Sequence, residues 1–209
     1  MSEQAVLDAL AAARVLPVVA VDDPSLVADL CAALLLGGIS CIEITFRTAA
    51  AEAAIAKAAE VEGMLVGAGT VLSPEQAHAA SAAGAAFAVA PGTDDEVVET
   101  CAGLGLPFFP GVATPSELGR ALRLGCSVVK VFPAAQLGGP AFLRAVSATF
   151  PHARFIPTGG IDAESLASYL AVPQVLACGG SWIADRTLVA ERSFAEVTSR
   201  ARAATVAAG

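Results

Sequence analysis

Short apolar stretches alternate with longer Ala-rich stretches along the whole chain, and this repeat limits the possible folds more than any other feature. About eight such units follow one another at a spacing of roughly 20–27 residues, near the short end of the range for a (β/α)8 barrel. Strands that alternate with helices require a parallel sheet, and short apolar strands suit a sheet buried on both faces. We therefore predict an α/β fold, a (β/α)8 TIM barrel formed by a single domain over residues 1–209, with an extra N-terminal helix over residues 2–13.

An open doubly wound sheet is the alternative architecture. It would require a glycine-rich fingerprint after the first strand, and residues 20–23 (Ala-Val-Asp-Asp) do not provide one. Active sites of barrels lie at the carboxyl ends of the strands, so functional residues are expected there. The predicted strands cover residues 15–21, 41–45, 64–68, 86–90, 107–109, 127–133, 154–157 and 175–177.

The composition argues against several classes of partner. The net charge is −8 and the few arginines are scattered, so nucleic-acid binding is not expected. No apolar run reaches the ~18 residues that a membrane span needs. The N-terminal stretch also lacks the layout of a signal peptide. We expect a cytoplasmic protein with no membrane partner.

Cysteine and histidine usage argues against a metal site. The five cysteines are an odd number with no close pair, so neither a disulfide framework nor a zinc knuckle is expected. His78 and His152 lie far apart, and no cluster of histidines or carboxylates accompanies them. We expect a protein without a metal or another cofactor.

Lys130 stands where a charged residue is unusual, in the middle of the apolar strand predicted over residues 127–133. The chain contains only two lysines, Lys57 and Lys130, against ten arginines. A lysine is rarely buried unless it is paired or functional, and unlike arginine it can lose its proton when desolvated and become a nucleophile. This strand alone leaves two interpretations open: a catalytic amine, or a lysine whose stem is buried while its ammonium group reaches water or a carboxylate.

Glu43 is the second unusual residue. It shares one face of its predicted strand with Cys41 and Thr45, while the other face is purely apolar and is expected to meet the helices. Glu43 would then face the barrel interior, where a carboxylate is costly without a partner. If Lys130 also faces inward, the two form either a structural ion pair or an amine with a proton-shuttling carboxylate, the minimum equipment of Schiff-base chemistry. We favour the catalytic interpretation.

Residues at two other strand ends suit an anionic substrate. Arg47 lies just past the second strand, where a planar guanidinium suits a carboxylate, although a solvated loop charge is the alternative. Gly67 and Gly69 at the end of the third strand would let a ligand approach the backbone, with the hydroxyl of Thr70 beside them.

Paired glycines follow the last two predicted strands, at Gly159-Gly160 and Gly179-Gly180, and a short helix is expected after the second pair. Backbone N–H groups and a helix N-terminus at this place form the phosphate site of many barrel enzymes. Two tight turns are the alternative, and we favour phosphate binding. Enzymes that catalyse many different reactions share such a phosphate site, so the site alone does not identify the reaction.

Six runs of this sequence, in order over nearly the whole chain, resemble those of 2-keto-3-deoxy-6-phosphogluconate (KDPG) aldolase. The resemblance implies a class I aldolase without a metal, a (β/α)8 barrel and a homotrimer. It implies cleavage of a phosphorylated keto-deoxy sugar acid to pyruvate and glyceraldehyde 3-phosphate, and many family members also cleave 4-hydroxy-2-oxoglutarate. The runs are 43–48 (Glu-Ile-Thr-Phe-Arg-Thr), 67–72 (Gly-Ala-Gly-Thr-Val-Leu), 90–92 (Ala-Pro-Gly), 109–114 (Phe-Pro-Gly-Val-Ala-Thr), 130–134 (Lys-Val-Phe-Pro-Ala) and 157–161 (Pro-Thr-Gly-Gly-Ile).

The resemblance also implies roles for individual residues. Lys130 would form the Schiff base, and Glu43 would shuttle protons. Arg47 and Thr70 would hold the pyruvyl carboxylate. The remaining residues implied at the site are Pro91 and Phe132, which would line it, Thr158, Gly159, Gly160, Gly180 and Ser181, which would take the phosphate end, and Arg14, a further candidate for the anion.

Two rival classes stay open on the residues alone. One is another phosphate-binding barrel enzyme, such as an isomerase or a thiamine-phosphate-type synthase, which would form no imine with pyruvate. The other is a catalytically silent barrel that binds sugar phosphates. Residue types also leave open the stereochemistry at C4 of the substrate and the preference between the phosphorylated substrate and 4-hydroxy-2-oxoglutarate.

Overall fold

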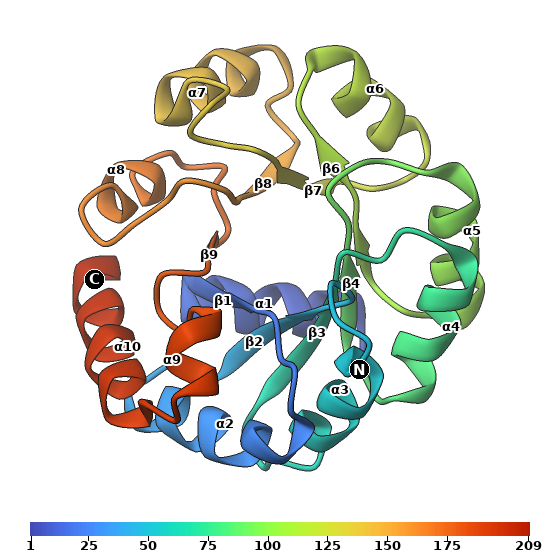
Figure 1. The fold of residues 1–209 in the computed structure, drawn as a ribbon. Helices are drawn as coiled ribbons and strands as arrows, with labels where there is room; N and C mark the ends of the chain where they lie inside the picture. Colours follow the sequence, from blue (N-terminus) through green and yellow to red (C-terminus); the bar gives the residue numbers. More distant parts are fainter.

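Parallel strands occupy the centre of the molecule, and helices surround them on the outside (Figure 1). The computed structural model describes all of residues 1–209. The strands are β1 (Val15–Val19), β2 (Cys41–Thr45), β3 (Leu65–Gly69), β4 (Phe87–Val89), β5 (Phe108–Phe109), β6 (Gly111–Val112), β7 (Val128–Val131), β8 (Arg154–Pro157) and β9 (Cys178–Gly180).

The helices alternate with the strands, as the repeat in the sequence predicts. Several begin at a side chain that accepts a hydrogen bond from the first turn, as at Ser73, Asp94 and Thr114. They are α1 (Glu3–Ala13), the 3-10 turn η1 (Pro24–Leu26), α2 (Val27–Leu36), α3 (Ala51–Ala59), α4 (Pro74–Ala82), α5 (Asp95–Leu104), α6 (Pro115–Arg123), α7 (Gly139–Thr149), α8 (Leu166–Leu170), α9 (Arg186–Ala190) and α10 (Phe194–Ala208).

The strands form two parallel sheets. The larger has six strands in the order β5-β4-β3-β2-β1-β9, and the smaller has the order β6-β7-β8. Only Pro110 separates β5 from β6, so one extended segment contributes to both sheets. At the other edge, isolated bridges join Phe155 to Val175 and Thr158 to Gly179. The result is a curled six-stranded sheet whose two ends are linked by the three-stranded sheet.

Helix α1 does not belong to the outer ring, and this confirms the extra N-terminal helix expected from the sequence. Figure 1 shows it behind the strands, across their amino ends. Its first turn is capped by the Ser2 hydroxyl, and its buried side chains are Val6, Leu7 and Leu10. The helix therefore covers the end of the sheets opposite to the one where the chain leaves each strand.

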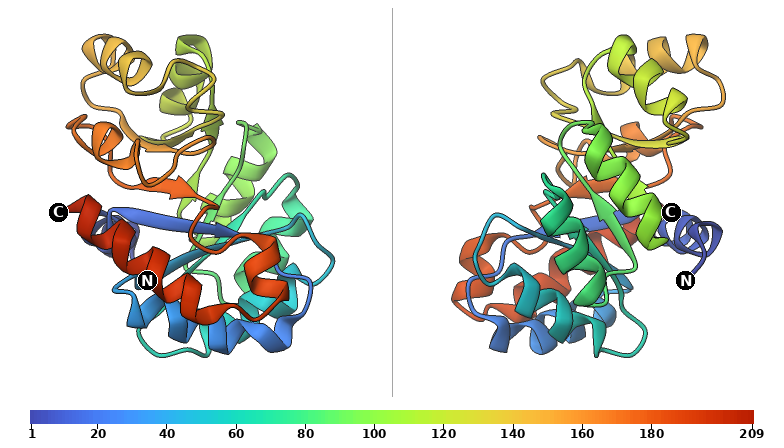
Figure 2. Two further views of the ribbon diagram at one scale, coloured as in Figure 1. Left: turned by 60° about the vertical axis from the view of Figure 1, so that its left-hand side comes forward. Right: turned by 90° about the vertical axis from the view of Figure 1, so that its right-hand side faces the viewer.

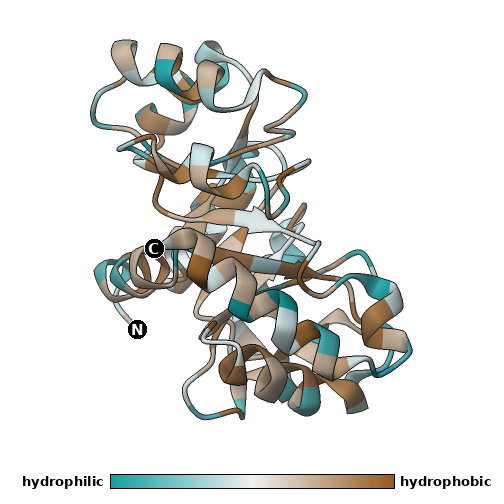
Figure 3. Cartoon of the chain, turned by 90° about the vertical axis from the view of Figure 1, so that its left-hand side faces the viewer, coloured by the Kyte–Doolittle hydropathy of each residue, from teal (hydrophilic) through white to brown (hydrophobic).

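A single cluster of 58 buried apolar residues connects the strands to the helices. Figure 3 shows hydrophobic residues along the central strands and mixed colouring on the helices around them. Small residues such as Ala54, Ala58 and Ala80 are completely buried on the inner sides of helices, which allows close packing against the sheet. The last helix, α10, packs on α2 and α8 at the outside of the molecule (Figure 2). No helix combines the length and the apolar character needed to cross a bilayer.

The prediction for the last strand is wrong by three residues. It placed the strand at residues 175–177, whereas β9 covers Cys178–Gly180 and Val175 takes part only in an isolated bridge. The Cys178 N–H donates to the Arg14 carbonyl oxygen at 2.8 Å, which sets the register of β9 against β1. The second glycine pair therefore lies within a strand and not in a turn after it.

Candidate active site

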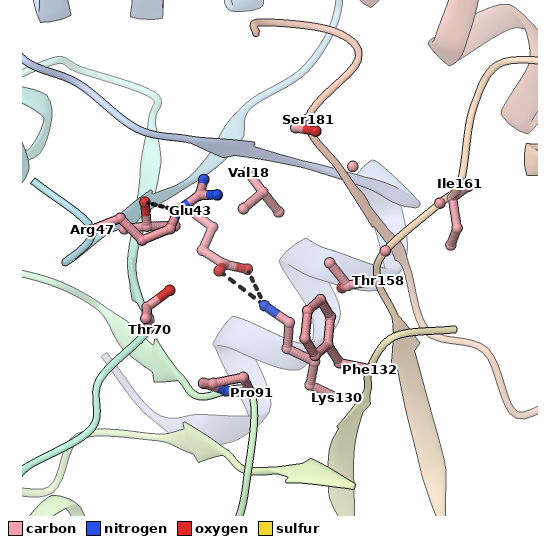
Figure 4. A pocket seen from close by; sticks show the side chains of 14 residues that line it. Val18, Glu43, Arg47, Thr70, Pro91, Lys130, Phe132, Thr158, Ile161 and Ser181 are labelled. Atoms are coloured by element: carbon pink, nitrogen blue, oxygen red, sulfur yellow. Dashed lines mark hydrogen bonds and ion pairs between the residues drawn. The ribbon is translucent and has the colours of Figure 1, made fainter. Parts of the chain in front are cut away.

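A cavity of about 320 Å³ opens at the carboxyl ends of the strands. Figure 4 shows side chains from both sheets converging on it. Functional residues were expected from the sequence at this end of the strands. The cavity is lined by Val18, Glu43, Thr45, Arg47, Thr70, Pro91, Lys130, Phe132, Thr158, Gly159, Gly160, Ile161, Gly180 and Ser181.

Lys130 and Glu43 meet at the floor of this cavity (Figure 4). The Lys130 ammonium nitrogen Nζ lies 3.1 Å from Glu43 Oε1 and 3.5 Å from Oε2. Glu43 is fully buried and Lys130 is 5% exposed. Each of these two buried side chains has the other as its hydrogen-bonding partner. The pair faces open space on the cavity side, where a substrate can reach the amine.

The space for the Glu43 side chain comes from a glycine on the neighbouring strand. A Cβ atom at Gly69 of β3 would overlap the Glu43 carboxyl group, and one at Gly67 would overlap the Phe87 ring. These glycines were expected to let a ligand approach the backbone. The structure corrects that interpretation, because side chains of the chain itself fill the space beside them. Gly69 is needed so that a carboxylate fits inside the sheet.

Arg47 is held by a buried hydroxyl. Its Nε donates to Thr45 Oγ1 at 2.9 Å, and the Thr45 hydroxyl donates to the Val19 carbonyl oxygen at 3.1 Å. Thr45 is 1% exposed, so its hydrogen bond to Val19 is shielded from water, while Arg47 itself is exposed. These hydrogen bonds fix the guanidinium at the rim of the cavity, with its terminal nitrogens available for an anion.

Thr70 lies across the cavity from the amine, directly after β3. Its φ of 59° is in the left-handed region, which is uncommon for a residue other than glycine. Such strain is often found at functional sites, where the fold holds a side chain in one orientation. Pro91 follows β4 on the same side of the cavity. Figure 4 shows both residues beside the Lys130–Glu43 pair.

The other side of the cavity is formed by the ends of β7, β8 and β9. Phe132 places its ring 5.9 Å from Lys130 Nζ, within reach of a cation–π contact. Gly159 and Gly160 have φ values of 98° and 74°, which favour glycine, and a Cβ at Gly159 would press on the Phe132 ring. Thr158 is buried beside them, and Ser181 is exposed at the opening. Small polar residues and backbone groups therefore dominate this side.

A family model described as KDPG and KHG aldolase matches residues 6–200 of the chain. The chain belongs to the KDPG and KHG aldolase family. It is 48% identical over 195 residues to a 2-dehydro-3-deoxy-phosphogluconate aldolase of Treponema pallidum, covering 93% of each chain. The fold and the order of the sequence motifs are thus those of an aldolase family.

Two solved structures of KDPG aldolases are similar over nearly their whole length. That of Legionella pneumophila, with pyruvate captured as a covalent carbinolamine intermediate, has a TM-score of 0.91 at 37% identity and covers 95% of this chain and 97% of its own. That of Zymomonas mobilis with 3-phosphoglycerate has a TM-score of 0.90 at 34% identity and covers 98% and 96%.

Eleven of the twelve residues to which the family resemblance gives a role line this one cavity. Three lining residues were not assigned to the site from the sequence: Val18, Thr45 and Ile161. Val18 and Ile161 are ordinary apolar residues beside functional ones, and nothing in the sequence distinguishes them. Thr45 was already placed on the same strand face as Glu43, and this position was a usable signal.

Arg14 is the exception. It ends α1 in a left-handed conformation, with a φ of 58°, and immediately precedes β1 at the amino end of the sheets. Five strand residues span about 16 Å, which separates it from the carboxyl ends where the cavity lies. Its Nε is buried without a hydrogen-bonding partner, and it does not line the cavity. The structure gives no support to the expectation that Arg14 reaches the substrate anion.

The short helix after the second glycine pair also differs from expectation. It is α9, and the Asp185 side chain accepts hydrogen bonds from the Thr187 and Leu188 N–H groups at its start. These groups are therefore not free to hold a phosphate. No group of three or more His, Cys, Asp or Glu side chains is arranged to bind a metal ion.

Proposed function

We propose that the chain is a class I aldolase that cleaves 2-dehydro-3-deoxy-6-phosphogluconate to pyruvate and glyceraldehyde 3-phosphate. The observation that carries this proposal is the buried Lys130–Glu43 pair at 3.1 Å, open to the cavity on one side. Membership of the KDPG and KHG aldolase family supports the substrate, and the carbinolamine in the Legionella pneumophila structure supports the covalent chemistry.

Lys130 is the nucleophile in this proposal. After its ammonium proton passes to Glu43, the free amine attacks the C2 carbonyl carbon of the substrate and gives a carbinolamine. Glu43 returns a proton to the C2 hydroxyl, which leaves as water and yields the protonated imine. Arg47 and Thr70 hold the carboxylate next to this carbon. Pro91 and Phe132 restrict the position of the carbon chain of the substrate. The protonated imine is the acceptor of electrons for the next step.

Cleavage then moves electrons from the C3–C4 bond into the imine. Glu43 removes the proton of the C4 hydroxyl, directly or through water, as that bond breaks and glyceraldehyde 3-phosphate forms. The remaining enamine takes a proton at C3, and water releases pyruvate from Lys130. The phosphate end of the substrate lies toward Thr158, Gly159, Gly160, Gly180 and Ser181.

Trapping with borohydride tests the covalent step. The protein is incubated with pyruvate and sodium borohydride, digested, and its peptides are weighed. We expect the peptide that contains Lys130 to gain the mass of a reduced pyruvyl adduct, and no adduct at Lys57, the other lysine. Pyruvate release from the phosphorylated substrate, coupled to lactate dehydrogenase, tests the reaction itself. An unmodified Lys130 peptide together with no pyruvate release would overturn the proposal.

Cleavage of 4-hydroxy-2-oxoglutarate to pyruvate and glyoxylate is a second candidate activity of the same site. The matching family is described by both aldolase activities, which favours it. The same keto acid end would engage Lys130 and Arg47, so only the distal contacts differ. Assaying both substrates side by side gives their relative kcat/KM, and no turnover of the shorter acid would exclude this activity.

The proposal extends to the architecture and the assembly. Counting β5 and β6 as one strand interrupted at Pro110 gives eight strands, which supports a (β/α)8 barrel formed by one domain over residues 1–209. The family resemblance supports a homotrimer. Light scattering of the purified protein tests the assembly, with a mass near three times 20.8 kDa expected; a monomer would exclude it.

A further inference from the structure

A second cavity of about 230 Å³ adjoins the first and shares Val18, Arg47 and Ser181 with it. Its outer wall includes Ala20, which follows β1, and Arg186, the first residue of α9. Arg186 was not assigned to the site from the sequence. Because Ser181 belongs to both cavities, a ligand group at the phosphate end of the first cavity borders the second.

One cationic side chain that lines these two cavities has no part in the mechanism proposed above. The proposed substrate carries a carboxylate and a phosphate, and the proposed function uses Arg47 for the carboxylate and Lys130 for the imine. Glu43 offsets the charge of Lys130, so the first cavity offers no further positive side chain to the phosphate. The second cavity adds a single one, that of Arg186.

We propose that Arg186 binds the distal phosphate of the substrate, an inference that rests on the aldolase function proposed above. In the unliganded protein its guanidinium is held by Asp22, through Nε–Oδ2 at 2.6 Å and Nη2–Oδ1 at 2.7 Å. This two-point geometry is the one in which a guanidinium also binds a phosphate. Asp22, which lines neither of the two cavities, thus occupies the guanidinium donors that a phosphate would need.

The exchange of Asp22 for phosphate is energetically accessible. The Arg186 and Asp22 side chains are 67% and 49% exposed, and exposed ion pairs contribute little to stability. The Arg186 guanidinium, through its hydrogen bonds, lowers the pKa of Asp22, so this carboxylate stays charged and competes with phosphate at neutral pH. Asp185, the acid that lines the second cavity, caps α9 and pairs with Arg200 at 3.2 Å. Asp22 is therefore the direct competitor.

Two substitutions with opposite expected signs test this role. The readout is the ratio of kcat/KM for the phosphorylated substrate to that for 2-dehydro-3-deoxygluconate, the same acid without phosphate. Arg186→Ala should lower this ratio about tenfold, since a hydrogen-bonded charge partner is lost. Asp22→Asn should raise it about threefold, since the competitor is weakened. Arg120→Ala, which breaks the exposed pair with Asp95 elsewhere on the surface, should leave the ratio unchanged.

Inorganic phosphate gives a readout that does not depend on turnover. Titration followed by phosphorus NMR should show weaker phosphate binding to Arg186→Ala and tighter binding to Asp22→Asn than to the parent. A parent that releases no pyruvate but shows these changes would reject the proposed reaction and keep the phosphate site. A parent that is active while Arg186→Ala keeps both the ratio and the phosphate affinity would overturn this inference, as would equal losses on both substrates.

Discussion

At the scale of single residues, the site depends on buried polar groups that have hydrogen-bonding partners within the protein. Lys130 and Glu43 satisfy each other, and Thr45 is held between the Val19 carbonyl and Arg47. Buried polar groups without partners cost free energy, so each of these contacts also maintains the orientation of its neighbour. A substitution at one of these positions is therefore expected to change the orientation of the residue that it contacts.

Replacing Glu43 with Gln should remove the proton shuttle from both imine formation and cleavage of the C3–C4 bond. The amide is of similar size but neither accepts nor returns a proton, so turnover should fall about 10²–10⁴-fold, the usual contribution of a general acid–base group. The rate is measured as pyruvate release, and thermal unfolding of the variant checks that it is folded. Turnover equal to that of the parent would remove Glu43 from the mechanism.

Replacing Thr45 with Val should weaken the binding of keto acids through Arg47. The variant keeps the side-chain shape but removes the hydroxyl that accepts from Arg47, so KM should rise about fivefold to tenfold, as for the loss of one hydrogen bond. The kcat value should change less than KM, because Thr45 does not touch the amine. Thr45→Ser, which keeps the hydroxyl, should restore KM; a serine variant as poor as the valine variant would contradict the positioning role.

The site was predictable from the sequence where a charge interrupts an apolar strand, as at Glu43 and Lys130. Such residues are unusual for their local context, so one sequence is enough to select them. Thr45 could have been assigned from its place on the same strand face as Glu43, whereas Arg186 could not, because its surroundings depend on distant parts of the chain. The expectation that Arg14 reaches the anion came from the resemblance, and the structure gives it no support, because Arg14 lies at the amino end of β1.

At the scale of elements, some helix starts carry a signal in the neighbouring sequence. The Thr114 hydroxyl accepts from the Glu117 N–H at the start of α6, and the Glu117 carboxylate accepts from the Thr114 N–H, a pairing visible as a spacing of three residues. The end strand β9 was misplaced because two of its three residues are glycines, which have low strand propensity. The register of β9 is fixed by contacts with β1 and Thr158, and these partners lie outside the sequence around β9.

Replacing Glu117 with Gln should destabilise the protein in a pH-dependent way. The hydrogen bond from the Ala113 N–H, with those from Thr114, holds the pKa of Glu117 below its ordinary value of 4.5, against the opposing effect of burial. A lowered folded-state pKa stabilises above the unfolded pKa, and this contribution is lost as the pH falls through the folded value. At pH 7 the variant should lose about 1 kcal/mol of unfolding free energy.

Urea unfolding at neutral pH and below pH 4.5 measures this difference, which should shrink in acid. Glu99→Gln, at an exposed position on α5, is the matched control and should change stability by less than about 0.5 kcal/mol at either pH. A Glu117→Gln effect of the same size at both pH values would show that charge on this residue does not stabilise α6.

At the scale of the whole molecule, the two sheets depend on a few contacts at their junctions. Near Pro110, the Gly111 N–H donates to the Gly92 carbonyl oxygen at 3.0 Å, and the Thr93 hydroxyl donates to the Gly111 carbonyl oxygen at 2.9 Å. These bonds join the end of β4 to β6 across the two sheets. Pro91, one residue before them, lines the cavity, so the junction also positions the site.

Replacing Gly111 with Ala should therefore affect folding and catalysis together. The added Cβ would overlap the backbone carbonyl of Pro91, which cannot move as a flexible side chain can. We expect a loss of about 1–3 kcal/mol in unfolding free energy, typical of overpacking, and a raised KM, because Pro91 is displaced toward the substrate.

Gly103→Ala on α5, where a Cβ meets nothing within 4 Å, should instead stabilise by about 0.5–1 kcal/mol. Unfolding curves and kinetics of both variants decide this, and a Gly111 variant as stable and active as the Gly103 variant would mean that the junction tolerates movement.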